Sequence, residues 1–286
     1  LQQLWSAVVG GLSTIPHLRQ AEPLPATVLN FKKVYMSNKK LKLYKYVSLS
    51  IAESIVVSST LRFTNPSNFN DPFDCNISRL KFEITEKIDP YAVNEIQVIK
   101  SNLKGKQGIT DEMIASISNG LLERGYKEMQ MKKNQKSSIC CFSLLANSPL
   151  MWAHYSDKHK GACLIFENSI SPKFLNIPDD RITESKVTYE PFSVFNFIEN
   201  KKKGILKLFA TKSRDWKYEK EYRYILLENE GLMKFNPSFL TGIIFGMNVN
   251  DKTIETFCKN CEREKVKLKY KRAVKETSGL KIIDIN

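Results

Sequence analysis

Hydrophobic and polar residues alternate in short runs along much of the chain, which is the pattern of β-strands. The first run is "LKLYKYVS" at residues 41–48, and a second strand is predicted at residues 61–64. Between them, the apolar residues of "LSIAESIVVS" recur at helical spacing and predict a helix. A turn-rich segment, "TNPSNFNDPFDC", follows. Strand, helix, strand and loop in such close succession are typical of an α/β or α+β domain.

Residues 84–136 have a different pattern. Charged residues are dense, and the segments "YAVNEIQVIKSNL" and "TDEMIASISNGLLERGYKEMQMKKN" have helical periodicity. Thr110 or Asp111 is the expected N-cap of the second helix. We therefore predict a helical insertion or lobe in this segment.

Strands and helices alternate again after residue 136. The predicted strands are "SSICCFSLL", "ACLIFE", "RITESKVTYE", "EKEYRYILL", "LTGIIFGMNV" and "VKLKYKRAV". The predicted helices are "SPLMWAHYSDKHKG", ending at Gly161, then "FNFIENKKKGILKLFATKS" and "DKTIETFCKNCEREK". "ACLIFE" is apolar enough to be a central strand, whereas "VKLKYKRAV" is basic and is expected at an edge. Because no Pro- or Gly-rich linker divides the chain, we predict a single α+β domain over residues 36–286.

The first 35 residues are unlike the rest. Residues 1–30 contain no lysine, and no basic region precedes the apolar patch "LWSAVVGGL", so a signal peptide is a poor fit. Met36 is the expected natural start. We interpret residues 1–35 as an added or poorly ordered extension and assign them no function.

Basic residues outnumber acidic ones, with 44 Lys and Arg against 30 Asp and Glu and a formal net charge of +14. This balance favours nucleic acid, an acidic protein or a phosphate-rich cofactor as partner, while a lysine-rich solubilising surface explains it equally well. No apolar run is long enough to span a bilayer, so no membrane is expected. The six cysteines lie among apolar residues and indicate reduced thiols in a cytoplasm. Cys258 and Cys261 have a metal-like or redox-like spacing without a second pair, so we predict helical core cysteines, with a metal site as the minor alternative.

The stretch "WKYEKEYRYI" at residues 216–225 places acidic residues inside an apparent strand. Alternate residues of a strand share a face, so Glu219, Glu221 and Arg223 are expected to project together. On spacing alone, the favoured interpretation is an internal ion pair between Arg223 and one of the two glutamates.

Three other segments carry candidate chemistry, each with a structural alternative. His154 and Tyr155 belong to a helix whose aromatic face either packs on the sheet or stacks on a nicotinamide or base. Asn70, Asp71 and Asp74 surround Pro72, where they either stabilise a turn or bind a ribose or a cation. The strand residues Tyr44, Lys45 and Tyr46 suit contact with phosphate or adenine, although an ordinary half-buried strand explains them nearly as well.

The order of these motifs resembles the bacterial domain-of-unknown-function family 2971. The resemblance rests on "LYKYVS", "LRFTNPSNFNDPFDC", "CFSLLANSPLMWAHYSDKHKGACLIFE" and "WKYEKEYRYI" and covers roughly residues 41–250. The name of that family carries no function.

A weaker resemblance is to the ADP-ribosyltransferase superfamily, whose members have a Tyr or Ser motif in the middle and Glu-x-Glu in a late strand. It implies a central mixed or split β-sheet and NAD as substrate. By this resemblance Glu221 is the essential carboxylate and Glu219 positions the acceptor, while Lys45 stands where the superfamily usually has His or Arg. The expected NAD-binding residues are Tyr44, Lys45, Tyr46, Asn70, Asp71, His154, Tyr155 and Arg223.

The expected function is therefore an ADP-ribosyltransferase-like effector, either a toxin or an anti-phage factor. It would transfer ADP-ribose from NAD to a nucleic acid or protein, and an antitoxin or another defence component is an expected partner. A nucleic-acid-binding or magnesium-dependent nuclease module is the alternative, and a non-catalytic interaction domain is the third hypothesis. We assign no metal ligands.

Overall fold

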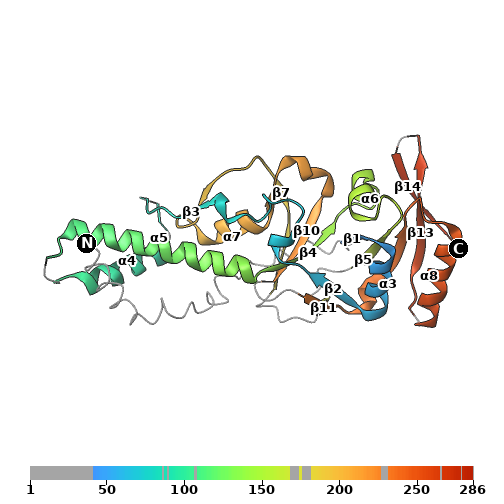
Figure 1. The fold of residues 1–286 in the computed structure, drawn as a ribbon, viewed down its shortest axis with the longest axis horizontal. Helices are drawn as coiled ribbons and strands as arrows, with labels where there is room; N and C mark the ends of the chain where they lie inside the picture. The colour runs from blue at the N-terminus through green and yellow to red at the C-terminus, as the bar shows by residue number, and fades with distance from the viewer. Residues whose placement is uncertain are drawn as a thin grey trace. The chain divides into compact units, whose positions relative to one another are not determined.

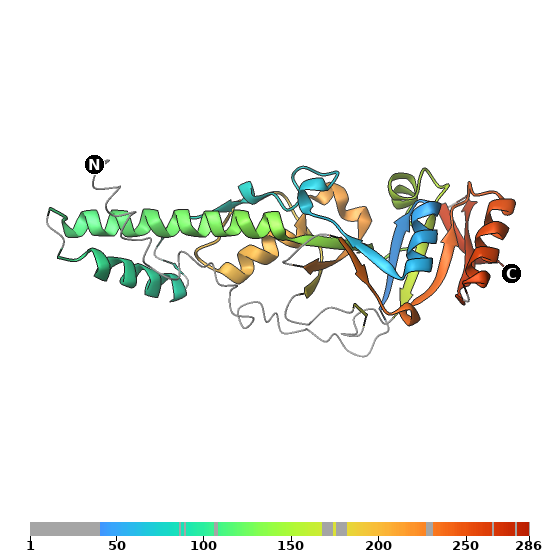
Figure 2. The same cartoon turned by 60° about the horizontal axis from the view of Figure 1, so that its bottom comes forward.

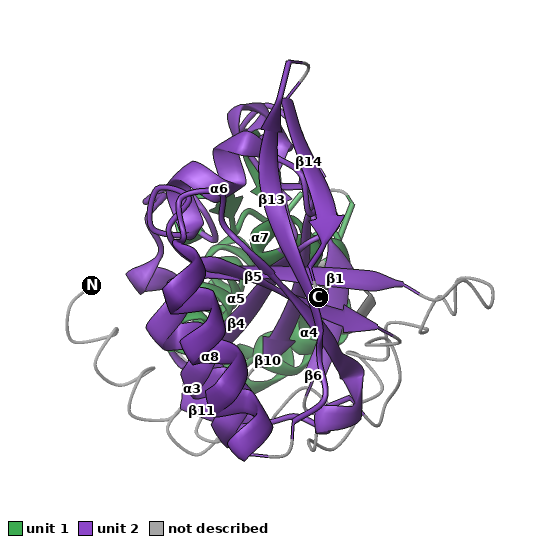
Figure 3. Cartoon of the chain, turned by 90° about the vertical axis from the view of Figure 1, so that its right-hand side faces the viewer, with its two compact units in different colours: residues 1–34, 76–135, 193–209 green, residues 35–75, 136–192, 210–286 purple. Residues whose placement is uncertain are grey.

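The computed structural model describes residues 41–85, 87–88, 90–105, 108–167, 174–175, 182–226, 231–264, 266–277 and 279–285. The chain divides into two compact units, coloured separately in Figure 3. Residues 1–34, 76–135 and 193–209 form the helical unit, and residues 35–75, 136–192 and 210–286 form the sheet unit. The first forty residues, including the predicted extension, lie outside the described residues.

An eight-stranded mixed sheet is the frame of the sheet unit (Figure 1). Its strand order is β14-β13-β12-β5-β1-β4-β10-β6. The strands are β1 (Lys42–Val47), β4 (Ser138–Ser143), β5 (Ala162–Glu167), β6 (Ile182–Lys186), β10 (Glu221–Leu226), β12 (Leu240–Phe245), β13 (Lys269–Glu276) and β14 (Gly279–Asp284). Only β12 and β13 pair in parallel, and the other neighbours are antiparallel. The predicted α+β class with a central mixed sheet is thus confirmed.

Helices cover both faces of this sheet. On one face, α3 (Leu49–Ser58) and α8 (Asp251–Arg263) pack beside each other over the larger hydrophobic core, as Figures 2 and 3 show. On the other face, α6 (Pro149–Tyr155) buries Met151 and Trp152 against Tyr46 and Ile165. We call this second side the α6 face. Because side chains alternate along a strand, Glu221 and Arg223 lie on it while Tyr222 and Tyr224 join the larger core.

Several element boundaries differ from the predictions. β13 was expected at an edge, but β14 pairs with it on its outer side, so β13 is internal. The helix α6 ends at Tyr155 and not at Gly161. Residues 157–159 have φ values of 46°, 51° and 67°, a left-handed backbone that cannot continue an α-helix. The predicted helix at 195–213 is shorter than expected, because α7 spans Lys201–Phe209 and residues 195–196 form β8.

The helical unit contains the two helices of the segment where an insertion was predicted. These are α4 (Pro90–Leu103) and α5 (Asp111–Lys136), which pack through Ile99, Leu103 and Ile114. Thr110 precedes α5, and its hydroxyl accepts a hydrogen bond from the Met113 N–H at 3.3 Å, so Thr110 is the N-cap. The unit also holds α7, η2 (Ile77–Arg79) and the parallel pair β3 (Leu80–Lys81) and β8 (Phe195–Asn196).

Short elements complete the sheet unit. They are β2 (Thr60–Phe63) with β11 (Gly231–Lys234), β7 (Thr188–Tyr189) with β9 (Thr211–Lys212), η1 (Pro66–Asn68), η3 (Arg214–Glu219) and η4 (Pro237–Phe239). All six cysteines are free thiols, and Cys258 and Cys261 lie on α8 against the larger core, as predicted. Among the described helices, none has an apolar stretch of the length that a bilayer crossing requires.

Candidate functional site

The stretch at residues 216–225 is two elements and not one strand. The short helix η3 ends at Glu219, Lys220 has a φ of 46°, and β10 begins at Glu221. The prediction that Glu219 shares a strand face with Glu221 and Arg223 is therefore wrong. The left-handed Lys220 redirects the chain, and the two glutamate side chains nevertheless approach the same cation, Lys212.

Arg223 is the centre of a buried ion cluster. Its guanidinium is 0% exposed and donates two hydrogen bonds to Glu221, from Nε to Oε1 at 2.9 Å and from Nη2 to Oε2 at 2.8 Å. The other side of the fork binds Asp74, with Nη1 to Oδ1 at 3.0 Å. The internal ion pair that the spacing favoured is present, with Glu221 as the partner and Asp74 as a second acid. Bidentate pairing of this kind fixes both distance and orientation.

These contacts decide the protonation states at this end. Burial by itself raises the pKa of Asp74, but attraction and hydrogen bonds from Arg223, with a contribution from Lys212, lower it below the ordinary value. Burial likewise disfavours a charged Arg223, but Glu221 and Asp74 hold its pKa well above the usual range. Both shifts favour the charged forms of Asp74 and Arg223.

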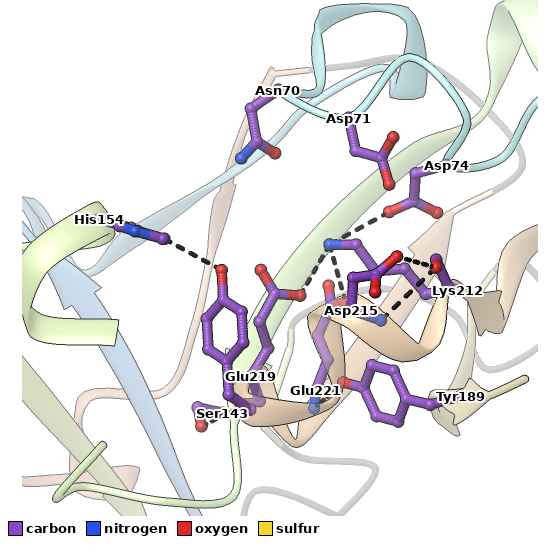
Figure 4. A network of polar contacts seen from close by, with 12 residues as sticks. Asn70, Asp71, Asp74, Ser143, His154, Tyr189, Lys212, Asp215, Glu219 and Glu221 are labelled. Carbon is purple, nitrogen blue, oxygen red and sulfur yellow. Dashed lines mark hydrogen bonds and ion pairs between the residues drawn. The ribbon is translucent and has the colours of Figure 1, made fainter. Parts of the chain in front are cut away.

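Lys212, on β9, carries the second buried cation. Its Nζ lies 2.7 Å from Glu219 Oε2, 3.5 Å from Asp74 Oδ2 and 3.8 Å from Glu221 Oε2. The ammonium also lies 4.6 Å from the centre of the Trp216 ring, a cation–π contact. Burial opposes the charge, but the three carboxylates raise the pKa of Lys212 above its ordinary value. Figure 4 shows the Lys212 side chain among Asp74, Glu219 and Glu221.

A metal ion does not fit this cluster. Within the described part of the chain, no group of three or more His, Cys, Asp or Glu side chains has an arrangement that could hold one. The carboxylates of Asp74, Glu219 and Glu221 surround the ammonium of Lys212, which occupies the place that a metal ion would take. Asp74 and Glu221 are further held by Arg223.

Glu219 forms the other end of the network. Its carboxyl accepts a hydrogen bond from the Tyr155 hydroxyl at 2.5 Å and one from Lys212 at 2.7 Å. The side-chain amide of Asn70 donates to the Tyr155 oxygen at 3.2 Å. Burial, followed by repulsion from Glu221, raises the pKa of Glu219 above the ordinary value of a glutamate. This carboxyl therefore has a stronger tendency to hold a proton than a free glutamate has.

The Glu219 end reaches the protein surface. Glu219 itself is 3% exposed, but Tyr155 is half-buried and Asn70 is exposed. His154, also exposed, contacts the Tyr218 hydroxyl at 3.0 Å through Nδ1 (Figure 4). The sequence-predicted residues Asn70, His154 and Tyr155 thus lie at this end, and we call the surface that they form the Glu219 edge. We call the chain of contacts from Asn70 through Tyr155, Glu219, Lys212 and Asp74 to Arg223 and Glu221 the polar network.

Asp71 lies in the same loop as Asn70 and Asp74 and is only 5% exposed. One of its carboxylate oxygens accepts the Phe73 N–H at 2.9 Å, which is the turn contact expected of an Asp before Pro. The other oxygen is buried and has no hydrogen-bond partner among the described residues. The turn therefore explains the contact of one carboxylate oxygen of Asp71 and not the burial of the other.

The three predicted residues of β1 lie away from the polar network. Tyr46 is buried against Trp152 and donates its hydroxyl to the Leu145 carbonyl at 2.7 Å. Lys45 projects toward the opposite face, where its ammonium donates to the Cys141 carbonyl at 2.9 Å. Tyr44 lines a separate pocket of about 850 Å³ whose lining includes neither Tyr155 nor either glutamate. The predicted NAD-binding residues are therefore not gathered in one cavity.

Two residues that contact the glutamates, Lys212 and Tyr189, were not predicted from the sequence. Lys212 lies in "FATKSRD", a segment with no motif, and it reaches Glu219 only because η3 turns the chain back. Tyr189 accepts a hydrogen bond from the Glu221 N–H at 2.7 Å and so fixes the start of β10. Neither residue has a sequence signal, since both contacts depend on how separate segments meet.

Comparison with known proteins adds one match. The family described as "Protein of unknown function (DUF2971)" matches residues 151–224, a segment that holds Tyr155, Lys212, both glutamates and Arg223. No curated protein and no solved structure matches the chain significantly. The similarity to ADP-ribosyltransferases gains no support from these comparisons. Residues 151–224 are thus similar to a family whose description states no activity, and most of the polar network comes from that segment.

Proposed function

We propose that the chain is a transferase that moves ADP-ribose from NAD to an acceptor, with Glu219 as the group that takes the acceptor's proton. The observation that carries this proposal is the surroundings of Glu219. It is a buried carboxyl with a raised pKa, and it is hydrogen-bonded to Tyr155 at the edge of the protein surface. A general base works best when its pKa lies closer to the working pH than that of a free glutamate.

The charge of the cluster supports the same reaction. Asp74, Glu219 and Glu221 supply three negative charges against the two positive charges of Lys212 and Arg223. Cleavage of a ribosyl C–N bond passes through a cationic, oxocarbenium-like state, which an excess of fixed negative charge stabilises. The rings of His154, Tyr155 and Tyr218 offer stacking surfaces for the nicotinamide or for a base at the Glu219 edge.

In the proposed step, the bond between ribose C1′ and the nicotinamide nitrogen breaks. Its electron pair leaves with neutral nicotinamide. An oxygen or nitrogen atom of the acceptor forms the new bond to C1′ and gives its proton to the Glu219 carboxylate. Glu221 has both carboxylate oxygens bonded to Arg223, so we assign it the task of holding Arg223 and Asp74 behind Glu219.

The test is transfer of label from biotinylated NAD to separate pools of DNA, RNA and protein. We expect labelling of one pool by the wild type, and a loss of about 10²- to 10⁴-fold with Glu219→Gln, because this change removes the base. Glu255→Gln, on the exposed side of α8, is the matched control and keeps full activity. Unchanged labelling by Glu219→Gln, or no labelling of any pool by the wild type, contradicts the proposal.

The nuclease alternative has one observation in its favour, the gathering of Asp74, Glu219 and Glu221 around a lysine. A magnesium ion at that place would have to displace the Lys212 ammonium. This alternative predicts magnesium-dependent cleavage of DNA or RNA that Asp74→Asn abolishes and that NAD does not affect. A role as a toxin or anti-phage effector, and an antitoxin or defence partner, remain predictions from the sequence.

A further inference from the structure

The pocket that contains Tyr44 is a second site on the α6 face. It has a volume of about 850 Å³ and lies over β1, β5, β12, β13 and β14, with the loop 144–147 at its border. Pockets for small molecules commonly measure about 300–1,000 Å³. We propose that this pocket binds a nucleoside monophosphate. The inference does not depend on the function proposed for Glu219.

The floor of the pocket is apolar. Ile165 and Ile244 are buried there, and Tyr44, Leu280 and Ile282 pack against them in the same hydrophobic cluster. These side chains come from adjacent strands, so they present a broad surface along the sheet rather than a narrow hole. A surface of this kind suits the flat ring of a nucleobase, which buries apolar area without needing a specific hydrogen-bond partner.

The rim of the pocket carries charges of both signs. Three lysines are paired with carboxylates, namely Lys42 with Glu167 at 2.8 Å, Lys271 with Asp284 at 2.5 Å and Lys281 with Glu276 at 2.9 Å. Lys269 also lines the pocket, is exposed, and has no ion pair within the described part of the chain.

This mixture of charges selects a small ligand. Lys269 supplies a positive charge that no described carboxylate pairs with, and a lysine ammonium is an ordinary partner of phosphate. The three carboxylates accept hydrogen bonds, as the hydroxyls of a ribose require. A long polyanion would meet the same carboxylates and be repelled by them, so a single phosphorylated nucleoside fits better than a nucleic acid strand.

The pocket and the Glu219 edge are separate. The loop at residues 144–147 leads into α6 and lines the pocket, whereas His154 and Tyr155, at the other end of α6, contact η3. A ligand in the pocket would therefore not touch Glu219, and the two sites can be altered independently.

The experiment is isothermal titration of the full chain with AMP, adenosine and inorganic phosphate. We expect AMP to bind, and adenosine and phosphate each to bind at least about tenfold more weakly. Adenosine lacks the phosphate that Lys269 would contact, and inorganic phosphate lacks the base that would cover the apolar floor. Lys269→Glu should weaken AMP binding at least about tenfold. Lys252→Glu, an equal charge change at the exposed start of α8, is the control and leaves AMP affinity unchanged.

The outcomes separate the two proposals. No AMP binding by the wild type, equal affinity in Lys269→Glu, or tighter binding of an RNA oligonucleotide than of AMP overturns the nucleotide site. Leu280→Lys, which places a charge on the floor, gives a second check and should also weaken AMP binding. Glu219→Gln should bind AMP like the wild type. A failure of NAD labelling leaves that result untouched and contradicts only the transferase.

Discussion

Glu221 and Glu219 are two residues apart, and their carboxyls have contrasting surroundings. Glu221 is held by two hydrogen bonds from the fully buried Arg223. Glu219 meets an ammonium and a phenol, and its pKa is raised by burial and by the charge of Glu221. The first glutamate is held in a rigid bidentate pair with Arg223, and the second has a raised pKa and so a greater tendency to hold a proton.

The two cations explain this difference. The planar fork of Arg223 donates to two carboxylates at once and sets their positions. Lys212 is a point charge that three carboxylates share, with only one of them within 3 Å. One end of the polar network is therefore a structural clamp, and the other keeps a carboxyl whose charge depends on its surroundings. Changes at the clamp should act on stability, and changes at Glu219 on titration and activity.

The largest expected effect follows from removal of the clamp. Among the described residues, Arg223→Met leaves Lys212 as the one cation beside the buried Asp74 and Glu221, so we expect the free energy of unfolding to fall by about 3–5 kcal/mol. Urea denaturation followed by circular dichroism measures it. Arg62→Met, at an exposed position of β2, is the matched control and should change stability by no more than about 0.5 kcal/mol. A loss below about 1 kcal/mol in Arg223→Met would mean that Arg223 is not the structural centre.

The second prediction compares how Asp74 and Glu219, at the two ends of the polar network, change protein stability with pH. The lowered pKa of Asp74 contributes stability that is present above its unfolded value, near 3.8, and is lost as pH falls through the folded value. The raised pKa of Glu219 acts in the opposite sense. Its contribution is present below the unfolded value, near 4.5, and is lost as pH rises through the folded value.

Stability should therefore change in opposite directions in the two variants. Relative to the wild type, Asp74→Asn becomes less stable as pH rises through the region below 3.8, and Glu219→Gln becomes more stable as pH rises above 4.5. A tenfold difference in proton affinity between the folded and unfolded states is worth about 1.4 kcal/mol. Urea midpoints measured from acidic to neutral pH give the two slopes. Slopes of equal sign would show that the two carboxyls are not distinguished by their surroundings.

Local periodicity was sufficient for much of the fold. The helix α3, the helix α8 and the central strand β5 were predicted because their apolar residues repeat within a few positions. The edge strand β14 was missed, although "GLKIID" alternates, because the basic pattern of its partner β13 fits an edge position by itself. The residue pattern of a single strand does not reveal whether another strand pairs with it on its outer side.

The candidate site was predictable only in part. Spacing indicated an ion pair for Arg223, and the Glu221 contact is that pair. It did not indicate the turn at Lys220, whose left-handed backbone is uncommon for a residue with a side chain. It also gave no reason to connect Lys212 with Asp74, which is far away in the chain. Contacts between distant segments depend on tertiary packing, which no local pattern encodes.

The smallest expected effect follows from a change beside Glu219, at the Tyr155 hydroxyl. Tyr155→Phe removes one hydroxyl, so we expect a stability loss of about 1 kcal/mol. The hydrogen bond from Tyr155 favours the ionised form of Glu219, so its removal should raise the pKa of Glu219 further. Carbon-13 NMR of labelled glutamate side chains measures this titration directly. The pH below which NAD transfer falls should rise by the same amount, since the base must be ionised to act.

Tyr44→Phe is the matched control for this change. It removes a hydroxyl from the same face of the sheet, but Tyr44 lines the 850 Å³ pocket and does not belong to the Glu219 edge. The Glu219 titration should be unaltered in that variant. If Tyr155→Phe also leaves the titration unaltered, the 2.5 Å contact does not influence the Glu219 carboxyl. A displaced titration in Tyr155→Phe alone would show that the Tyr155 hydroxyl helps to set the pKa of Glu219.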